Sequence, residues 1–493
     1  MFDLGLERLE ALVRLPTISQ QVAFREMQGR IGWRLSQQET FDQAREMLVG
    51  WLQGIADEVG TQKVSLPGGL VGYNVWARVK GHDETAAVLL QGHYDVVEVN
   101  GTYQPYQQEG RLYGRGTTDM KGGVVAAIMA VESLVREGER PFVDTYLLFT
   151  CEEEVAAGGA MKVVAEPFTW LKKVKLAICL EPGYGHDGFE YSWGHPGIAG
   201  LSLTVPLPQT AGHGERWRVR IEPGLGLVDH ASREPGSIDA NGIMFSTLGQ
   251  LRAGGVVSWY SDRSIDGAIN STAAWAEAVV ATDVGGHGVY EAAQRALNYH
   301  LERVEEPERI NHLRHVTKIE VEQASGGGVV YDLGRFGDAL AGLRARVATY
   351  TNEVYSRPPL TLAVVAVGEG QARVKIDIRT DNALRQDLPE MLAELFPAPM
   401  QAELMWNDPA FAGREVVENR YFRRLLVAHR ARRRVLVQGH TGWTEAAIWS
   451  TLLDIPTIVG GPGRMGVAHT IQEFIDLSHW GEMVGVLVDF LRD

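Results

Sequence analysis

The spacing of apolar and polar residues predicts alternating helices and strands in the first part of the chain. Apolar residues recur at helical intervals over Leu4–Leu15 and Phe41–Val59, and runs typical of strands cover Val71–Val79 and Ala86–Leu90. The next predicted elements are a helix, a strand, a short helix and a strand, at Met120–Arg136, Asp144–Thr150, Ala157–Ala165 and Leu176–Leu180. Strands separated by helices predict an α/β fold with a mainly parallel sheet that helices cover on both faces.

The pattern changes near Pro196-Gly197 and changes back after Pro397–Pro399. Between these breaks, strand-like runs such as Leu201–Val205 and Ala372–Ile378 are mixed with helical ones such as Asn241–Leu251. We therefore expect residues 1–197 and 407–493 to form one domain, interrupted by an inserted α+β domain at 198–406. Within the insertion, residues 254–344 are a candidate elaboration with a substructure of its own.

Composition and charge narrow the function classes. The chain has 493 residues with 47 basic and 62 acidic side chains, and its net charge of −15 argues against a nucleic-acid partner. No apolar run is long enough for a membrane span, and the first residues lack the pattern of a signal peptide. The cysteines Cys151 and Cys179 lie in apolar runs and are expected to be buried and unpaired. We expect a cytoplasmic protein with neither nucleic-acid nor membrane partners.

Five candidate metal ligands follow predicted strands or loops in chain order: His93, Asp119, one glutamate of the run 152–154, Glu181 and His469. Two imidazoles and three carboxylates suit a catalytic zinc site better than a structural one, which would favour thiolates. Three carboxylates are too many for one ion, whereas they offset three of the four charges of two divalent ions. The set therefore predicts a two-metal hydrolase centre with a bridging carboxylate.

Neighbouring residues add to this prediction. Asp95 lies two residues after His93 on the same side of an extended segment, so it is expected to accept the second imidazole N–H. Each candidate also has an ordinary explanation when taken singly. Asp119, for example, is expected at the N-cap of the helix that begins with Met120, and a glutamate run often starts a solvated helix. The combination of all five is what indicates a metal site.

Several segments carry a resemblance to a known family, which covers most of the chain. They are GHYDVV (92–97), GRGTTDMKGG (114–123), FTCEEEVAAGGA (149–160), LEPG (180–183), DHASREPGSIDANGI (229–243), KIDIRTD (375–381), WTEAAIW (443–449) and GGPGRMGVAHTIQEF (460–474). In these the chain resembles the di-zinc amidohydrolases and exopeptidases that include acetylornithine deacetylase, succinyl-diaminopimelate desuccinylase, aminoacylase and the carboxypeptidase G type. The resemblance implies that His93 and Glu181 hold one metal, that a glutamate of the triplet and His469 hold the other, and that Asp119 bridges them.

The glutamate triplet allows two registers against the family pattern. In the preferred one, Glu152 is the acid that precedes the pair, Glu153 is the general base and Glu154 is the metal ligand. The alternative shifts the pair to Glu152 and Glu153, with Gly158 as the following glycine. Both registers fit the residues, and the choice between them stays open at this point.

The resemblance also implies that the insertion is a lid and dimerisation domain. His230 matches a lid histidine that reaches the partner subunit's active site and donates to the oxyanion, with a surface histidine as the alternative. Arg379 matches an arginine that grips the substrate carboxylate, with an arginine paired to a neighbouring aspartate as the alternative. The chain departs from the family at Gly368–Gln371, which affects lid contacts to the substrate, and at Glu445, where an aspartate is usual and which is expected to alter the pocket rim.

From these residues and this resemblance, we expect a metal-dependent hydrolase that cleaves an amide bond next to a free carboxylate. Two divalent ions, zinc or else cobalt or manganese, are expected to activate water, with Glu153 as base and His230 as oxyanion donor. The substrate is an N-acyl amino acid or a peptide, and the residues do not separate a deacylase from a dipeptidase or carboxypeptidase. The resemblance also implies a homodimer through the lid. The alternative from another class is a non-catalytic binding or scaffold protein on the same fold.

Overall fold

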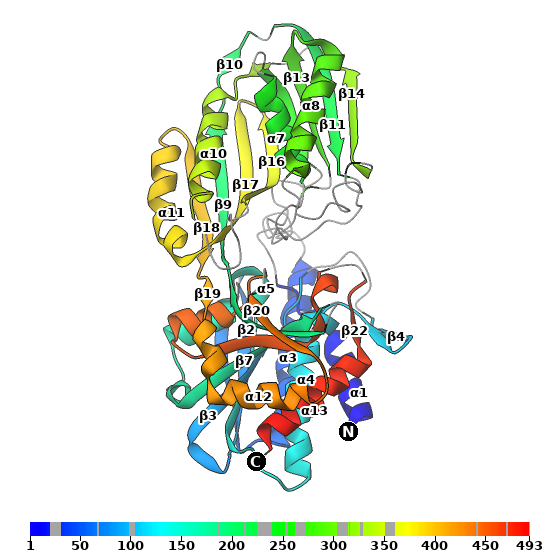
Figure 1. Ribbon diagram of the computed structural model, residues 1–493, viewed down its shortest axis with the longest axis vertical. Helices are drawn as coiled ribbons and strands as arrows, with labels where there is room; N and C mark the ends of the chain where they lie inside the picture. The colour runs from blue at the N-terminus through cyan, green and yellow to red at the C-terminus, as the bar shows by residue number, and fades with distance from the viewer. Residues whose placement is uncertain are drawn as a thin grey trace. The chain divides into compact units, whose positions relative to one another are not determined.

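In the computed structural model the chain forms two compact units. One comprises Met1–His195, Phe411–His440 and Thr444–Asp493, and the other comprises Pro196–Ala410 with Thr441–Trp443. Figure 1 shows both units and labels many of their helices and strands. The structure describes residues 1–19, 31–66, 69–97, 104–185, 188–211, 213–223, 239–251, 255–261, 273, 275–302, 314, 316–325, 329–350, 360–439, 442–469 and 472–492.

The first unit is built on a mixed sheet that, within the described residues, has nine strands. Its path is β1-β2-β6-β3-β7-β21-β8-β19, and β20 pairs with β8. The central pairs β6–β3, β3–β7 and β7–β21 are parallel, whereas β1 and β2 are antiparallel to their neighbours. The strands are β1 (Glu58–Leu66), β2 (Leu70–Val79), β3 (Asp83–His93), β6 (Val143–Thr150), β7 (Val174–Tyr184), β8 (Phe189–His195), β19 (Phe411–Ala412), β20 (Val435–Gly439) and β21 (Thr457–Arg464).

Helices cover this sheet, as its sequence pattern requires. All eight residues of β6 are buried, so the centre of the sheet meets packed side chains on both faces. The central helix α4 packs closely on β7, because a Cβ at Gly123 would lie 2.4 Å from the carbonyl oxygen of Leu180. The helices are α1 (Phe2–Val13), α3 (Ile31–Gln53), α4 (Gly122–Arg136), α5 (Glu153–Ala156), α6 (Gly158–Ala165), α12 (Arg420–Arg430) and α13 (Leu477–Leu491). A small separate sheet holds β4 (Tyr106–Gln108), β5 (Arg111–Tyr113) and β22 (Phe474–Asp476).

Three local predictions were wrong. The helix predicted at Phe41–Val59 ends at Gln53, and Val59 is already in β1, because its hairpin with β2 pairs these residues. Asp119 is not an N-cap: it has extended torsion angles (φ −124°, ψ 96°) inside a π-turn at Thr117–Lys121, and α4 begins at Gly122. Glu181 does not follow a strand, because β7 continues through it to Tyr184.

The second unit is an antiparallel sheet with helices packed against it. Within the described residues the sheet has ten strands, on the path β14-β11-β13-β12-β16-β17-β9-β18 with β10 and β15 at its side. The apolar faces of the helices and strands enclose one core that includes Trp259, Phe336 and Leu388. The elements are β9 (Gly197–Pro206), β10 (Gln209–Thr210), β11 (Glu215–Glu222), α7 (Ala240–Gln250), β12 (Gly255–Ser261), β13 (Ala276–Thr282), α8 (Gly285–Leu301), β14 (Lys318–Gln323), β15 (Val330–Tyr331), α10 (Gly334–Val347), β16 (Leu360–Gly368), β17 (Gln371–Thr380), α11 (Asn382–Leu395) and β18 (Gln401–Asp408).

Two further observations bear on the expectations above. Cys151 and Cys179 are free and buried, as predicted. Among the helices that the structure describes, none combines the length and the apolar character that crossing a membrane needs.

Candidate metal centre

Three neighbouring parallel strands deliver four of the predicted site residues. His93 is the last residue of β3, and Glu153 and Glu154 begin α5 directly after β6. Glu181 lies near the end of β7. Since β3 is flanked by β6 on one side and β7 on the other, these side chains gather at the carboxyl edge of the sheet.

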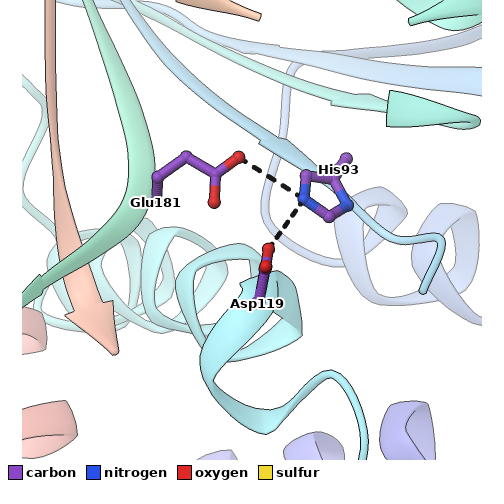
Figure 2. A group of neighbouring side chains, drawn as sticks. All are labelled: His93, Asp119 and Glu181. Atoms are coloured by element: carbon purple, nitrogen blue, oxygen red, sulfur yellow. Dashed lines mark hydrogen bonds and ion pairs between the residues drawn. The ribbon is translucent and has the colours of Figure 1, made fainter. Parts of the chain in front are cut away.

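Asp119 is the residue that two imidazoles share. Its Oδ1 atom lies 3.1 Å from Nε2 of His93, and its Oδ2 atom lies 3.1 Å from Nε2 of His469. Glu181 Oε1 lies 3.4 Å from the same His93 nitrogen, so that His93, Asp119 and Glu181 converge on one point (Figure 2). A carboxylate whose two oxygens face different imidazoles has the arrangement of a bridging ligand between two ions.

The glutamate run separates into three different environments. Glu154 Oε2 lies 2.9 Å from His469 Nε2, while Glu153 Oε2 lies 3.8 Å from His93 Nε2. Glu152 takes part in none of the metal-ligating groups found among the described residues. It is 4 % exposed, and burial and the charge of Asp95 raise its pKa to about 8. This geometry favours the register in which Glu153 and Glu154 form the functional pair.

The donor set fits divalent cations. Three groups of side chains each bring their ligand atoms within 4.8 Å of one another, and these are His93–Asp119–Glu181, His93–Glu153–Glu154 and Asp119–Glu154–His469. The Oε1 atom of Glu154 is buried and has no hydrogen-bond partner among the described residues. Imidazole nitrogens with carboxylate oxygens, one of them buried without a donor, suit zinc and related metals.

The electrostatics of the group point the same way. Burial raises the pKa of Glu153 and of Glu154, and burial together with the charge of Asp119 raises the pKa of Glu181 to about 7. Burial opposes a charged His93, but Glu181 and Asp119 raise its pKa well above the ordinary value. So many carboxylates in one buried cluster repel each other, and positive charge at its centre relieves the repulsion.

Asp95 orients more of the site than the sequence indicated. His93 Nδ1 lies 3.2 Å from the Asp95 carbonyl oxygen and 3.4 Å from its Oδ1 atom. The same carboxylate accepts the backbone N–H groups of Glu153 (3.1 Å) and Glu154 (3.2 Å), and the hydroxyl of Ser19 (2.5 Å). One buried carboxylate thus holds both the imidazole and the start of α5.

Sequence reasoning misplaced Glu445. It is fully buried rather than at a pocket rim, and it accepts hydrogen bonds from Thr150 (2.6 Å) and from Gln91. Gln91 in turn accepts a hydrogen bond from Cys179 (2.8 Å). This network joins β6, β3 and β7 at positions just before His93 and Glu181, so it underlies the candidate metal centre.

The remaining predicted residues lie elsewhere. His230 is outside the described residues. Arg379 lies in β17 of the second unit, is fully buried, and places its Nε atom 3.2 Å from Asp377 Oδ1. This ion pair is the arrangement that the alternative expectation gave, and the terminal atoms Nη1 and Nη2 have no hydrogen-bond partner among the described residues. The Gly368–Gln371 segment is the turn between β16 and β17, with positive φ at Glu369 and Gly370.

Comparison with known proteins adds to this geometry. Residues 89–493 match the model of peptidase family M20/M25/M40. Over 101 residues, 19 % of this chain and 26 % of the relative, the chain is 38 % identical to a protein named succinyl-diaminopimelate desuccinylase from Delftia acidovorans. Over 255 residues, 50 % of this chain and 44 % of the relative, it is 26 % identical to N-fatty-acyl-amino acid synthase/hydrolase PM20D1 from Xenopus tropicalis. Each match thus spans less than half of the curated relative's length.

Solved structures share the fold over nearly the whole chain. Aminoacylhistidine dipeptidase from Vibrio alginolyticus superposes with a TM-score of 0.62 at 16 % identity, over 98 % of this chain and 96 % of that one. Human carnosine dipeptidase 1 superposes with a TM-score of 0.60 at 14 % identity, over 99 % of this chain and 96 % of that one. At such identities the likeness establishes the fold, an α/β unit combined with a second domain.

Proposed function

This chain belongs to peptidase family M20/M25/M40 and is therefore a hydrolase of the metallopeptidase type, and we propose that it cleaves an amide bond next to a free carboxylate with two divalent metal ions. The observation that carries the proposal is the position of Asp119, with each carboxylate oxygen 3.1 Å from a different imidazole. We propose zinc as the metal, with cobalt or manganese as alternatives. His93 and Glu181 would hold one ion, Glu154 and His469 the other, and Asp119 both.

Residues of the chain itself would carry out the proton transfers of the reaction. Two divalent ions held by these residues would polarise a carbonyl oxygen and lower the pKa of a bound water. Glu153 would accept a proton from the attacking water at Oε2 and return it to the leaving amine. Asp95 holds the backbone of Glu153 and the ring of His93, so it would keep base and ligand in register.

The second unit would supply substrate contacts. Arg379 is buried and ion-paired with Asp377 through Nε, and its Nη1 and Nη2 atoms have no hydrogen-bond partner among the described residues, which supports a role in binding a carboxylate. His230 would donate to the oxyanion from the partner subunit of a homodimer formed through this unit. The names of the relatives support two substrate classes, N-acyl amino acids and dipeptides. The alternative of a non-catalytic protein has no support, because all five predicted ligands and the base are present.

A substrate screen with metal analysis tests this proposal. The purified protein is loaded with zinc, cobalt or manganese and tested against N-succinyl, N-acetyl and N-formyl amino acids and against dipeptides. We expect about two ions per chain and hydrolysis of at least one class. A chelator should abolish this activity, and the metal should restore it. One ion or fewer under metal-replete conditions would overturn the two-metal proposal, and two bound ions without hydrolysis of any class would overturn the proposed reaction.

A further inference from the structure

Glu473 is a buried carboxylate next to the loop that carries Asp119. It lies four residues after His469, at the start of the segment that becomes β22, and is 3 % exposed. It belongs to none of the metal-ligating groups found among the described residues. A buried charge that is not a ligand needs other partners, and the structure provides them.

One oxygen of Glu473 collects three backbone N–H groups. Oε1 accepts hydrogen bonds from Gly116 (2.9 Å), Thr118 (3.0 Å) and Asp119 itself (3.1 Å). The other oxygen forms an ion pair with Arg115 that is also buried. Backbone N–H groups of one turn that point at one anion form a nest, and here the anion is a side chain of the same protein, while the N–H of Thr117 between them bonds to the Gly114 carbonyl oxygen.

The loop folds round this carboxylate only because of its glycines. Gly116 has a φ of +86°, and a Cβ there would lie 2.7 Å from Val96 and 3.1 Å from Lys121. Two residues further on, Thr118 donates from its hydroxyl to the carbonyl of Phe474 (2.6 Å). The turn at 114–119 is therefore shaped to meet Glu473 and its neighbours.

The same contacts join two chain segments that each supply a metal ligand. Gly114 donates its N–H to the backbone carbonyl of Glu473 (3.0 Å). The loop side presents Asp119 and the other side presents His469, whose Nε2 atom lies 3.1 Å from Asp119 Oδ2. Holding the loop to the segment thus determines the separation of these two ligands.

We propose that Glu473 is a positioning residue, whose carboxylate serves as an internal anion that holds the Gly114–Asp119 loop so that Asp119 can face both metals. The inference rests on the proposed function, since it needs a metal centre at Asp119. Removing this carboxylate leaves three inward-facing N–H groups without an acceptor, and the loop then relaxes away from His469.

Two variants test the inference, one by removing only the charge of Glu473 and the other by removing the whole ion pair. Glu473→Gln keeps the shape and one acceptor oxygen but removes the charge. The double variant Arg115→Met/Glu473→Met removes the whole ion pair without leaving a buried unpaired charge, and it leaves the N–H groups without an acceptor. The matched control is Glu132→Gln, because Glu132 is similarly buried and paired with Arg8 and Arg136, and among the described residues it has no hydrogen bond or ion pair with the loop.

The main measurement is the metal dissociation constant of the metal-free protein, by competition with a chromogenic chelator. Loss of a partner behind a metal ligand typically weakens binding about 10–100-fold. We expect about 10-fold for Glu473→Gln and up to about 100-fold for the double variant, with the control within about twofold of the parent chain. In the loaded enzyme kcat should fall while KM stays within about twofold, because substrate contacts are intact.

Circular dichroism and thermal unfolding in chelator establish that each variant is folded. If the double variant does not fold, Glu473→Gln carries the test by itself. Unchanged metal affinity in a folded variant would overturn the inference and show that the ion pair contributes only to packing. An equal loss in Glu132→Gln would also overturn it. If instead the parent chain binds no metal, the proposed function has failed, and this outcome is distinct from the other two.

Discussion

Exchanging each glutamate of the run 152–154 for glutamine separates the base from the ligand. Glutamine keeps the size of the side chain and removes its charge and its ability to take up a proton. Glu153 faces His93 at 3.8 Å, Glu154 faces His469 at 2.9 Å, and Glu152 lies outside the three metal-ligating groups. The three substitutions should therefore have three different consequences.

The magnitudes follow from these positions. General base catalysis contributes about 10²–10⁴-fold, so Glu153→Gln should raise the activation free energy by about 3–5 kcal/mol. Glu154 supplies one of three ligands in its group, and its loss should weaken the metal by more than the roughly 100-fold that an outer-shell change costs. Burial and the charge of Asp95 raise the pKa of Glu152 to about 8. Its carboxyl is then mostly protonated at neutral pH, and glutamine should change the rate by only about twofold.

The assay combines elemental analysis after dialysis with steady-state kinetics on the best substrate from the screen. Glu153→Gln should retain about two ions per chain and lose turnover, whereas Glu154→Gln should retain about one. Glu152→Gln should resemble the parent chain in both measurements and so serves as the matched control.

A different ordering would refute the reasoning. If Glu153→Gln loses an ion and Glu152→Gln loses turnover, the functional pair is Glu152 and Glu153. If Glu153→Gln remains fully active with two ions, another group must act as the base.

The remaining predictions concern other parts of the chain. Arg379→Met should lower kcat/KM by about 10–100-fold for substrates with a free carboxylate, the loss of about 1.5–3 kcal/mol in charged hydrogen bonds, and a substrate with an amidated carboxylate should show no such loss. Mixing inactive Glu153→Gln subunits with inactive His230→Ala subunits should restore activity; a mixture that stays inactive despite proven subunit exchange contradicts action from the partner subunit. Burial raises the pKa of Glu445 from 4.5 to about 8, so the folded chain keeps a proton that the unfolded chain releases. Stability should therefore fall as pH rises from about 4.5 to 8, and thermal unfolding of Glu445→Gln should show a weaker decline; an equal decline would contradict the assignment.

The local pattern was sufficient for the elements that form the centre of the first unit. The alternation of apolar runs and helical periods predicted β3, β6 and α4. Buried parallel strands show short apolar runs, and the helix that covers them shows helical spacing of apolar residues, in any compact arrangement of these elements. The positions of His93 and of the glutamate run at strand ends followed from the same pattern. The family resemblance, which the match over residues 89–493 confirms, came from motifs that are contiguous in the chain.

The local sequence pattern did not predict the contacts between distant segments. Asp119 looked like a helix cap because an aspartate before a helical run usually is one, but its backbone is extended and its carboxylate faces two histidines. Glu445 was expected at a pocket rim, and it is buried and hydrogen-bonded beneath the candidate metal centre. In both cases the tertiary neighbours decided the role, since a side chain's local sequence does not specify what packs against it.

By itself, then, the sequence determined the α/β class, the order of the candidate ligands and the chemistry that imidazoles with carboxylates can support. Only the tertiary structure decided that one carboxylate serves two imidazoles, which glutamates of the run face them, and that Glu473 fills the nest made by the Gly114–Asp119 loop. The physical reason is that periodicity and residue type act over a few neighbouring positions. Sharing a ligand or burying a charge instead depends on atoms brought within about 3 Å of each other from far apart in the chain.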